Sequence, residues 1–277
     1  MKEIINNKFL GPIELFGVNI LFKIKNRQMK VGIGIKKNQN SLKKIFNIDG
    51  LKSNMKIENF LNIFSIVPKT TFLFQNRPED RRNFLDQMIS SIDLNFKKYL
   101  SSYEKYKSER FKILKKWNVE SQNWLCLVEK KLASVGIVIC DARRNFIKEL
   151  NRRFDKSSKY FPSIELKLNG ELDTLLKTKP AVDVEEFFLK KLEENRKKDI
   201  LTGKTNFSAN KTDLIAYQSK TMQEAKNHST GEQKIIVFSI IFSFLKLLES
   251  KSDLKVIFLL DDVFSFLDKN HILMVLD

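Results

Sequence analysis

Two scarcities in this 277-residue sequence exclude several kinds of site before any motif is considered. It contains only two cysteines, Cys126 and Cys140, and two histidines, His228 and His271. Two cysteines are too few for a disulfide framework or a tetrahedral zinc site, and two histidines argue against a histidine-based metal centre. No G-x-S-x-G segment supports a hydrolytic serine. We therefore expect free, buried thiols in a reducing compartment.

The sequence also lacks the long apolar runs of a membrane protein. No stretch approaches the roughly eighteen consecutive apolar residues that a membrane span needs. Residues 1–30 do not have the layout of a signal peptide. The cytoplasm is therefore the expected compartment. Apolar residues still make up 42% of the chain, which is enough to bury a substantial core in one large domain or two ordinary ones.

Acidic residues are few compared with basic ones. Fifty lysines and arginines face 33 aspartates and glutamates, which gives a formal net charge of +17 and a pI near 9.7. Such a charge produces a positive field that attracts polyanions, nucleic acid first among them. A second explanation stays open, because the chain is rich in the Lys, Asn, Ile and Phe that an AT-rich genome over-supplies.

The middle of the chain predicts long helices. Residues 79–116 contain neither proline nor glycine, and their apolar residues recur every three or four positions, so we expect one long helix or two with a tight joint. A second helical stretch covers 119–154, with an interruption near Gly136. The basic side chains of the two stretches together form either a solvated helix face or a DNA-facing surface. The candidate DNA-binding residues are Lys112, Lys115, Lys116, Arg143, Arg144, Arg152 and Arg153.

Shorter patterns predict the remaining elements. Gly32 and Gly34 fall in an expected strand, where they suggest a bulge or close backbone packing. In chain order, the sequence predicts a β-hairpin over 17–36, a helix leading into a strand over 58–74, a strand over 164–168, a charged helix over 183–199 and a strand over 213–217.

The strongest functional pattern lies near the end of the sequence. Ser229-Thr230-Gly231-Glu232-Gln233 has the form S-x-G-[EQ]-Q and opens an apolar helix over 232–248. In ATPases of the ABC type, such a loop belongs to one subunit and contacts the γ-phosphate of ATP bound to the other. A small hydroxyl residue and a glycine let backbone N–H groups approach that phosphate, and the helix dipole favours it. Ser229, Gly231 and Gln233 are the candidate ATP-binding residues here.

A buried strand with acidic residues at its end follows this loop. The apolar run 256–260 precedes Asp261 and Asp262, which is where P-loop ATPases hold the Mg²⁺ of the nucleotide. Asp261 is the candidate metal ligand, and Asp262 is the candidate catalytic acid that positions the attacking water. Asp268 fits a loop along the seam between two subunits and is a further ATP-binding candidate. The alternative is a buried strand that merely ends in a polar turn.

The phosphate loop of such an ATPase, G-x-x-x-x-G-K-[ST], is missing. Gly203-Lys204-Thr205 is similar to its end, but Lys198 stands where the first glycine is required. The preceding residues 185–199 predict a charged helix, whereas a phosphate loop follows a strand. The chain ends at Asp277, inside the helix expected after the acidic strand. We therefore expect a fragment that does not bind ATP in the usual way by itself.

Four stretches together resemble the RecF family of bacterial ATPases. Pro78–Asp86 is similar to the family's P-x-x-R-R-x-F-L-D segment, and Leu189–Thr205 to the helix and turn before its G-P-H-[RK]-x-D-L loop. Ser229–Gln233 and Leu259–Asp268 are similar to its signature loop and its acidic strand. The resemblance covers essentially the whole chain. One departure falls on 208–211, where Ser-Ala-Asn-Lys replaces G-P-H-R.

The resemblance implies an α/β fold, namely an ABC-type (SMC/RecF-like) ATPase head with an inserted helical lid domain. The head would comprise residues 1–75 and 201–277, and the lid residues 76–200. ATP and Mg²⁺ would be the cofactors of an ATP-dependent homodimer. That dimer would clamp DNA at single-strand/double-strand junctions during gap repair and the SOS response, with RecO and RecR as partners.

Two alternatives stay open beside this clamp. The first is a degenerate DNA-binding protein without ATPase activity. The second is another SMC- or Rad50-like ATPase head. That head needs a long heptad coiled coil, for which residues 79–154 are too short and irregular.

Overall fold

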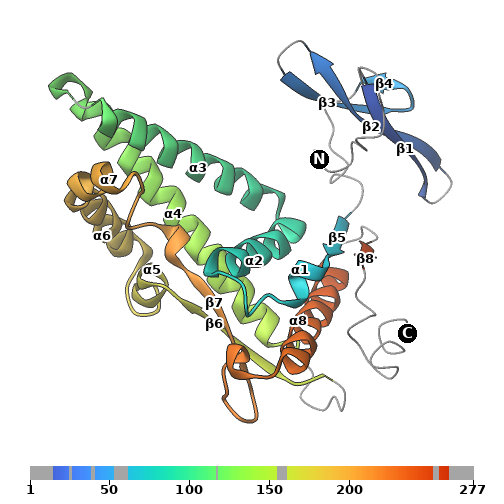
Figure 1. Ribbon diagram of the computed structural model, residues 1–277. Helices are drawn as coiled ribbons and strands as arrows, with labels where there is room; N and C mark the ends of the chain where they lie inside the picture. Colours follow the sequence, from blue (N-terminus) through green and yellow to red (C-terminus); the bar gives the residue numbers. More distant parts are fainter. Residues whose placement is uncertain are drawn as a thin grey trace. The chain divides into compact units, whose positions relative to one another are not determined.

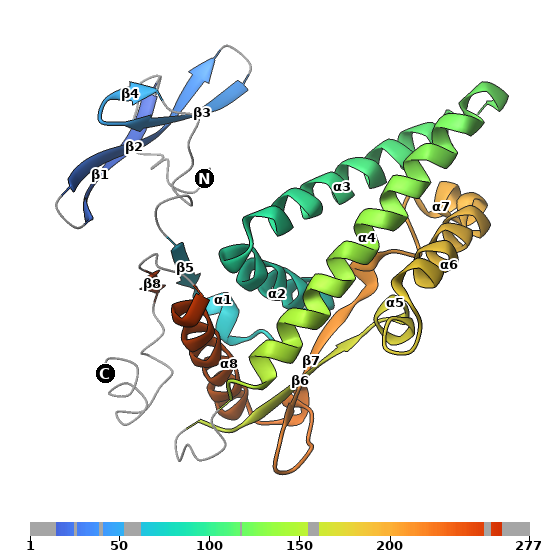
Figure 2. The same cartoon turned by 180° about the vertical axis from the view of Figure 1, so that it is seen from behind.

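The computed structural model describes residues 15–24, 27–38, 41–52, 62–116, 118–154, 161–251 and 256–261. The chain divides into two compact units, Met1–Asn62 and Ile63–Asp277. Figures 1 and 2 show the elements of both units from opposite sides.

The smaller unit is an antiparallel sheet in which neighbouring strands follow each other in sequence. Its strands are β1 (Leu15–Ile24), β2 (Arg27–Asn38), β3 (Ser41–Ile48) and β4 (Leu51–Lys52). The predicted hairpin is confirmed, and β1 pairs with β2 without a break from Leu15↔Lys36 to Ile24↔Arg27. There is thus no bulge at Gly32. A Cβ there would lie 2.8 Å from Oδ1 of Asn19, the end of an exposed side chain that can move aside, so close backbone packing is not shown either.

The larger unit is mainly helical. Its helices are α1 (Pro68–Thr71), α2 (Pro78–Ile92), α3 (Leu94–Lys115), α4 (Gln122–Asn151), α5 (Glu171–Leu175), α6 (Ala181–Glu194), α7 (Arg196–Thr202) and α8 (Thr230–Lys251). Its strands are β5 (Asn62–Ile66), β6 (Ile164–Asn169), β7 (Asp213–Gln218) and β8 (Val256–Leu260). The strands predicted over 164–168 and 213–217 are thus confirmed as β6 and β7, which pair antiparallel.

The long helical region is a helix pair followed by one uninterrupted helix. α2 and α3 meet at Asp93, whose side chain caps α3 by accepting a hydrogen bond from the N–H of Asn95 at 2.8 Å. The predicted interruption at Gly136 is wrong, because α4 runs straight through it. A Cβ at that position would lie 2.6 Å from a ring carbon of Phe188 and 3.0 Å from Tyr103. The glycine therefore allows α3 and α6 to pack closely on α4.

Two other element predictions need correction. Over 58–74, the strand β5 comes before the helix α1, the reverse of the predicted order, and residues 58–61 lie outside the described residues. Pro68 occupies the first turn of α1, where its fixed φ is favourable. The single helix predicted over 183–199 is two helices, α6 and α7. Gly203, with φ of 68°, ends α7 in the left-handed conformation, which supports a turn and not a phosphate loop.

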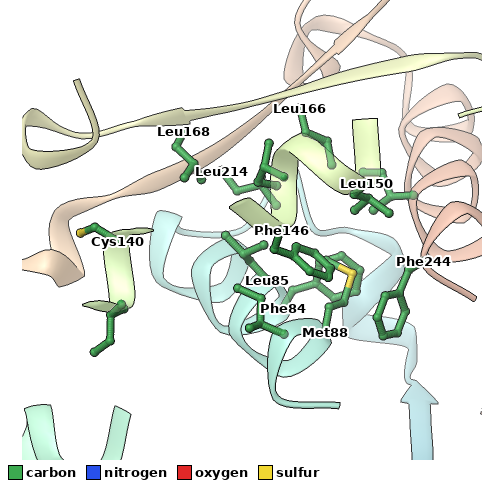
Figure 3. Packing of buried hydrophobic residues seen from close by; sticks show 14 of the residues in the cluster. Phe84, Leu85, Met88, Cys140, Phe146, Leu150, Leu166, Leu168, Leu214 and Phe244 are labelled. Carbon is green, nitrogen blue, oxygen red and sulfur yellow. The ribbon is translucent and has the colours of Figure 1, made fainter. Parts of the chain in front are cut away.

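One hydrophobic core runs through the larger unit. Figure 3 shows side chains of α2, α4 and α8 packed against the two strands β6 and β7. The labelled members are Phe84, Leu85, Met88, Cys140, Phe146, Leu150, Leu166, Leu168, Leu214 and Phe244. Among the described residues, the core extends from Phe64 to Leu248, so residues from all three predicted domain segments contribute to it. The domain boundaries themselves stay a prediction.

A buried ion pair lies beside this core. Arg143 of α4 is fully buried, and its Nε and Nη2 donate to the two carboxylate oxygens of Asp86 on α2, each at 2.7 Å. Its Nη1 donates to the backbone carbonyl of Ala209, also at 2.7 Å. The prediction that Arg143 faces DNA is therefore wrong, because the side chain is enclosed and its three nitrogens all bond to protein oxygens.

A second buried network joins the far end of α4 to its neighbours. Arg110 of α3 is fully buried and donates to Glu129 of α4 at 2.9 Å and to Asp199 of α7 at 2.6 Å. It also donates to the carbonyl of Leu192 at the end of α6, at 2.7 Å. One guanidinium thus connects four helices.

We predict that Asp86→Asn lowers the free energy of unfolding by about 3–5 kcal/mol, because it leaves the charge of Arg143 buried without its counter-charge. Urea denaturation at neutral pH measures this loss. The matched control is Asp80→Asn, which removes a carboxylate whose ion pair with Lys69 lies at the surface. The control should change stability little. Equal losses in both variants would show that the buried pair contributes no more than the exposed one.

A buried carboxylate generates a second prediction. Asp173 is fully buried, accepts a hydrogen bond from the Thr212 hydroxyl at 2.5 Å, and has a second oxygen without a partner among the described residues. Burial raises its pKa above the ordinary value of 3.8, because the charged form loses hydration. A carboxyl group whose pKa is raised on folding stabilises the folded protein at pH values below its ordinary pKa. This stabilisation is lost as the pH rises through the pKa of the folded state.

Asp173→Asn should therefore gain stability relative to the unchanged protein as pH rises from about 4 to 7. Urea denaturation of both proteins at several pH values gives this difference directly. Asp183→Asn, at an exposed position in the first turn of α6, is the control and should show a flat difference. A flat difference for Asp173→Asn as well would contradict the prediction.

Candidate functional site

The loop Ser229–Gln233 forms the start of α8 and is held by its own side chains. The carboxylate of Glu232 accepts hydrogen bonds from the Ser229 hydroxyl at 2.7 Å and from the Ser229 N–H at 2.9 Å. The N–H of Glu232 in turn lies 3.4 Å from the Ser229 hydroxyl oxygen. This reciprocal arrangement is a capping box. The bonds from Ser229 also lower the pKa of the Glu232 carboxyl, so the loop is fixed by a charged group.

Backbone donors remain available at this helix start. The first N–H groups of any α-helix have no acceptor within the helix. In α8 they belong to residues around Thr230 and Gly231, both of which are exposed. The positive end of the helix dipole lies at the same place, so the loop has the chemistry to bind an anion such as a phosphate group.

Gly231 has no function inside the fold that the structure reveals. Its φ lies outside the left-handed region, and a Cβ added to it would meet no atom within 4 Å. A glycine within a helix costs roughly 0.5–1 kcal/mol relative to alanine. Because no internal contact compensates this cost, the missing side chain points to an approach from outside.

Gln233 supports the loop from behind. It is 4% exposed, and its amide nitrogen donates to the carbonyls of Lys226 and His228 at 3.1 and 2.9 Å. Its amide oxygen and Nε2 of His228 are buried without a hydrogen-bond partner among the described residues. Sequence reasoning missed His228, although its position next to the motif and the scarcity of histidine were available signals. Contact between Gln233 and ATP stays a prediction.

Asp261 lies at the carboxyl end of the short sheet formed by β5 and β8. Its backbone N–H donates to the carbonyl of Ile66 at 3.0 Å, so the carboxyl ends of both strands meet there. Asp261 is exposed, which suits a Mg²⁺ ion held by one carboxylate, water and phosphate oxygens. Asp262 and Asp268 lie outside the described residues.

Other metal chemistry finds no support in the part of the chain that the structure describes. Those residues include no group of three or more His, Cys, Asp or Glu side chains that could hold a metal ion. Cys126 and Cys140 are both free thiols, but only Cys140 is buried as predicted, whereas Cys126 is half-buried. Burial raises the pKa of Cys140 to about 12, so this cysteine stays protonated and unreactive.

The structure does not bring the loop and Asp261 together within one copy. α8 has 22 residues, which corresponds to a length of about 33 Å. The loop opens this helix, whereas the β5–β8 pair lies beside its other end in both views (Figures 1 and 2). A site that uses both features therefore needs two copies of the chain.

The predicted basic surface is split into two parts. Lys112, Lys115 and Lys116 are exposed at the end of α3, and Arg152 and Arg153 are exposed just after α4. α3 packs antiparallel to α4 (Figure 1). The two groups thus lie at opposite ends of a 30-residue helix about 45 Å long. Arg144 lies between the two groups along α4, and its Nη1 is 3.6 Å from Oδ1 of Asp141.

Comparison with known proteins gives the family. No family model matches the chain. The chain is 30% identical over 246 aligned residues to the DNA replication and repair protein RecF of Rickettsia typhi. The aligned region covers 87% of this chain and 68% of that protein. The chain belongs to the RecF family. The RecF protein of Rhizobium etli is 29% identical over 248 residues, or 88% of this chain and 66% of that protein.

Solved RecF structures share the fold. The recombination mediator protein RecF with ATP, in the RecFOR pathway, superposes with a TM-score of 0.76 at 25% identity and covers 95% of this chain and 71% of that one. A second RecF structure, described as RecF-ATPrS, gives a TM-score of 0.78 at 24% identity and covers 95% of this chain and 72% of that one. The predicted family and the ABC-type α/β fold are thus confirmed, while the roles of single residues stay predictions.

We predict that Gly231→Ala leaves the free energy of unfolding unchanged or raises it by up to about 1 kcal/mol. The control is the second helical glycine, Gly136→Ala, which should cost about 1–3 kcal/mol because its methyl group collides with Phe188. Urea denaturation distinguishes the two. A clear loss of stability in Gly231→Ala would reveal an internal reason for this glycine.

Proposed function

We propose that the protein acts in DNA replication and repair as a RecF-type, ATP-dependent DNA clamp. In this clamp, Ser229, Gly231 and Gln233 of one copy contribute to a nucleotide site completed by the partner copy. The observation that carries the proposal is Gly231, an exposed glycine without an internal function at the start of a helix with free N–H donors. The separation of this loop from Asp261 along α8 supports a site shared between two copies.

The nucleotide chemistry is divided among few residues. Asp261 is the proposed ligand of Mg²⁺, which neutralises charge on the phosphates. Asp262 is proposed to position the attacking water, and Asp268 to lie along the seam between the copies. The 277 residues contain no phosphate loop. ATP hydrolysis is therefore proposed for full-length members of the family and not for these residues alone.

DNA binding is proposed for the exposed basic residues at the two ends of the α3–α4 pair. Their contacts to phosphates would make the affinity fall steeply with salt. The RecF structures are described as part of the RecFOR pathway, which supports RecO and RecR as partners. The proposed target is a single-strand/double-strand junction, and the proposed role includes the SOS response. We also propose that residues 1–75 and 201–277 form the head and residues 76–200 the lid.

The cytoplasm is the proposed compartment. Among the helices that the structure describes, none combines the length and the apolar character that crossing a membrane requires. A DNA clamp acts where the chromosome is, which in a bacterium is the cytoplasm.

A second candidate function is DNA binding without ATPase activity. It is favoured by the absent phosphate loop and by the sequence Ser-Ala-Asn-Lys at 208–211. The two functions differ in whether nucleotide changes self-association and DNA affinity.

The test is sedimentation velocity of the protein as expressed from its gene, with and without ATP and Mg²⁺. The clamp predicts a nucleotide-dependent dimer that Gly231→Arg abolishes, because the added side chain occupies the open space beside the loop. Ser101→Arg, at an exposed position on α3, adds the same charge and should still dimerise. A monomer under all conditions, with DNA affinity that depends on salt but not on nucleotide, would instead support the second candidate.

A further inference from the structure

A groove opens between α2, α3 and the segment 203–211, away from the loop at α8. Its volume is about 390 Å³, within the range of small-ligand pockets. Its cationic lining residues are Arg82, Lys107, Lys204 and Lys211, which outnumber the two carboxylates Glu79 and Glu104, and Phe111 is its aromatic residue. All of them belong to the larger unit of a single copy, so the groove does not depend on a dimer.

The wall of this groove is firmly built. Glu104 of α3 accepts hydrogen bonds from the amide of Asn210 and from Lys107, each at 2.7 Å. The hydroxyl of Tyr103 accepts one from the N–H of Ala209 at 2.9 Å. Burial opposes ionisation of Glu104, but the bonds from Lys107 and Asn210 outweigh it and lower its pKa. A charged carboxylate thus fastens the segment 208–211 to α3.

Several cationic donors of the groove remain unused within the protein. Lys204 and Lys211 are exposed, and their side chains make no hydrogen bond or ion pair among the described residues. Arg82 is half-buried and uses one nitrogen, Nη1, in a 3.3 Å bond to the carbonyl of Thr212. Burial, followed by the charge of Arg143, lowers the pKa of Arg82. An anion in the groove would relieve the cost of holding this guanidinium partly out of water.

One aromatic side chain distinguishes the groove from a simple basic patch. Phe111 forms part of its wall, and Lys115 Nζ lies 5.0 Å from the centre of the ring. The left-handed φ of Gly203 brings the turn against Phe111, so that a Cβ on this glycine would lie 3.8 Å from the ring. Cationic donors beside an aromatic face are what proteins use to bind a phosphate and its neighbouring base.

We propose that this groove binds one nucleotide unit. Its phosphate contacts Lys204, Lys211 and Arg82, and its base lies against Phe111. Single-stranded nucleic acid and a free mononucleotide both present this chemistry. The proposal extends the proposed DNA binding, but it requires neither ATP nor dimerisation.

The first experiment measures binding of a fluorescein-labelled short oligothymidylate by anisotropy, at low salt and without ATP. The double variant Lys204→Ala with Lys211→Ala should weaken binding by at least about fivefold, because two of the three proposed phosphate contacts are lost. The control is Lys177→Ala with Lys179→Ala, which removes the same charge from an exposed segment outside the groove. The control should weaken binding less than about twofold. Equal losses in both double variants would overturn the proposal.

Competition then distinguishes the source of the nucleotide. Displacement of the oligomer by thymidine monophosphate, at concentrations where inorganic phosphate has no effect, identifies a free mononucleotide as the ligand. Displacement by unlabelled oligomer alone identifies single-stranded nucleic acid. Phe111→Leu should weaken binding severalfold for whichever of the two ligands binds more tightly. An unchanged affinity would overturn the proposed contact between the base and Phe111. Because ATP is absent throughout, a failure of ATP-dependent dimerisation leaves these results unaffected.

Discussion

The contact between Arg143 and Asp86 is the constraint on which the arrangement of the larger unit depends. It connects the middle of α4 to α2, and the third bond of the guanidinium fixes the carbonyl of Ala209. A buried arginine is tolerated only where its donors are satisfied. The bond from the guanidinium holds Ala209 in place, and with it the segment 208–211 that forms the wall of the groove against α3.

A second arginine, Arg110, has a comparable function further along α4. It connects α3, α4, α6 and α7 near the end of the helix pair that lies away from α8 (Figures 1 and 2). Buried ion pairs contribute little net stability compared with apolar packing, but breaking one is costly. We infer that their effect here is to favour one arrangement of the helices over others that apolar contacts alone would also allow.

The sequence predicts those features that depend on neighbouring residues. The hairpin β1–β2, the long helices, the strands β6 and β7, and the loop that opens α8 all follow from local periodicity or from a short motif. The burial of Arg143 could not be predicted in this way, because its partners are 57 and 66 residues away in the chain. The uninterrupted helix at Gly136 depends likewise on Phe188, which lies on another helix. Within the candidate site, the motif identified Ser229 and Gly231, whereas the supporting position of Gln233 required the structure.

In the proposed nucleotide site, Glu232 would act by fixing Ser229 at the start of α8. Its carboxylate holds Ser229 through two short hydrogen bonds before anything binds. Ordering a backbone residue costs about 1–2 kcal/mol, and here that cost has already been met during folding. In the proposed nucleotide site, the loop would therefore act as a rigid receptor, and its affinity would depend on the fit of its donors and not on the entropy of arranging them.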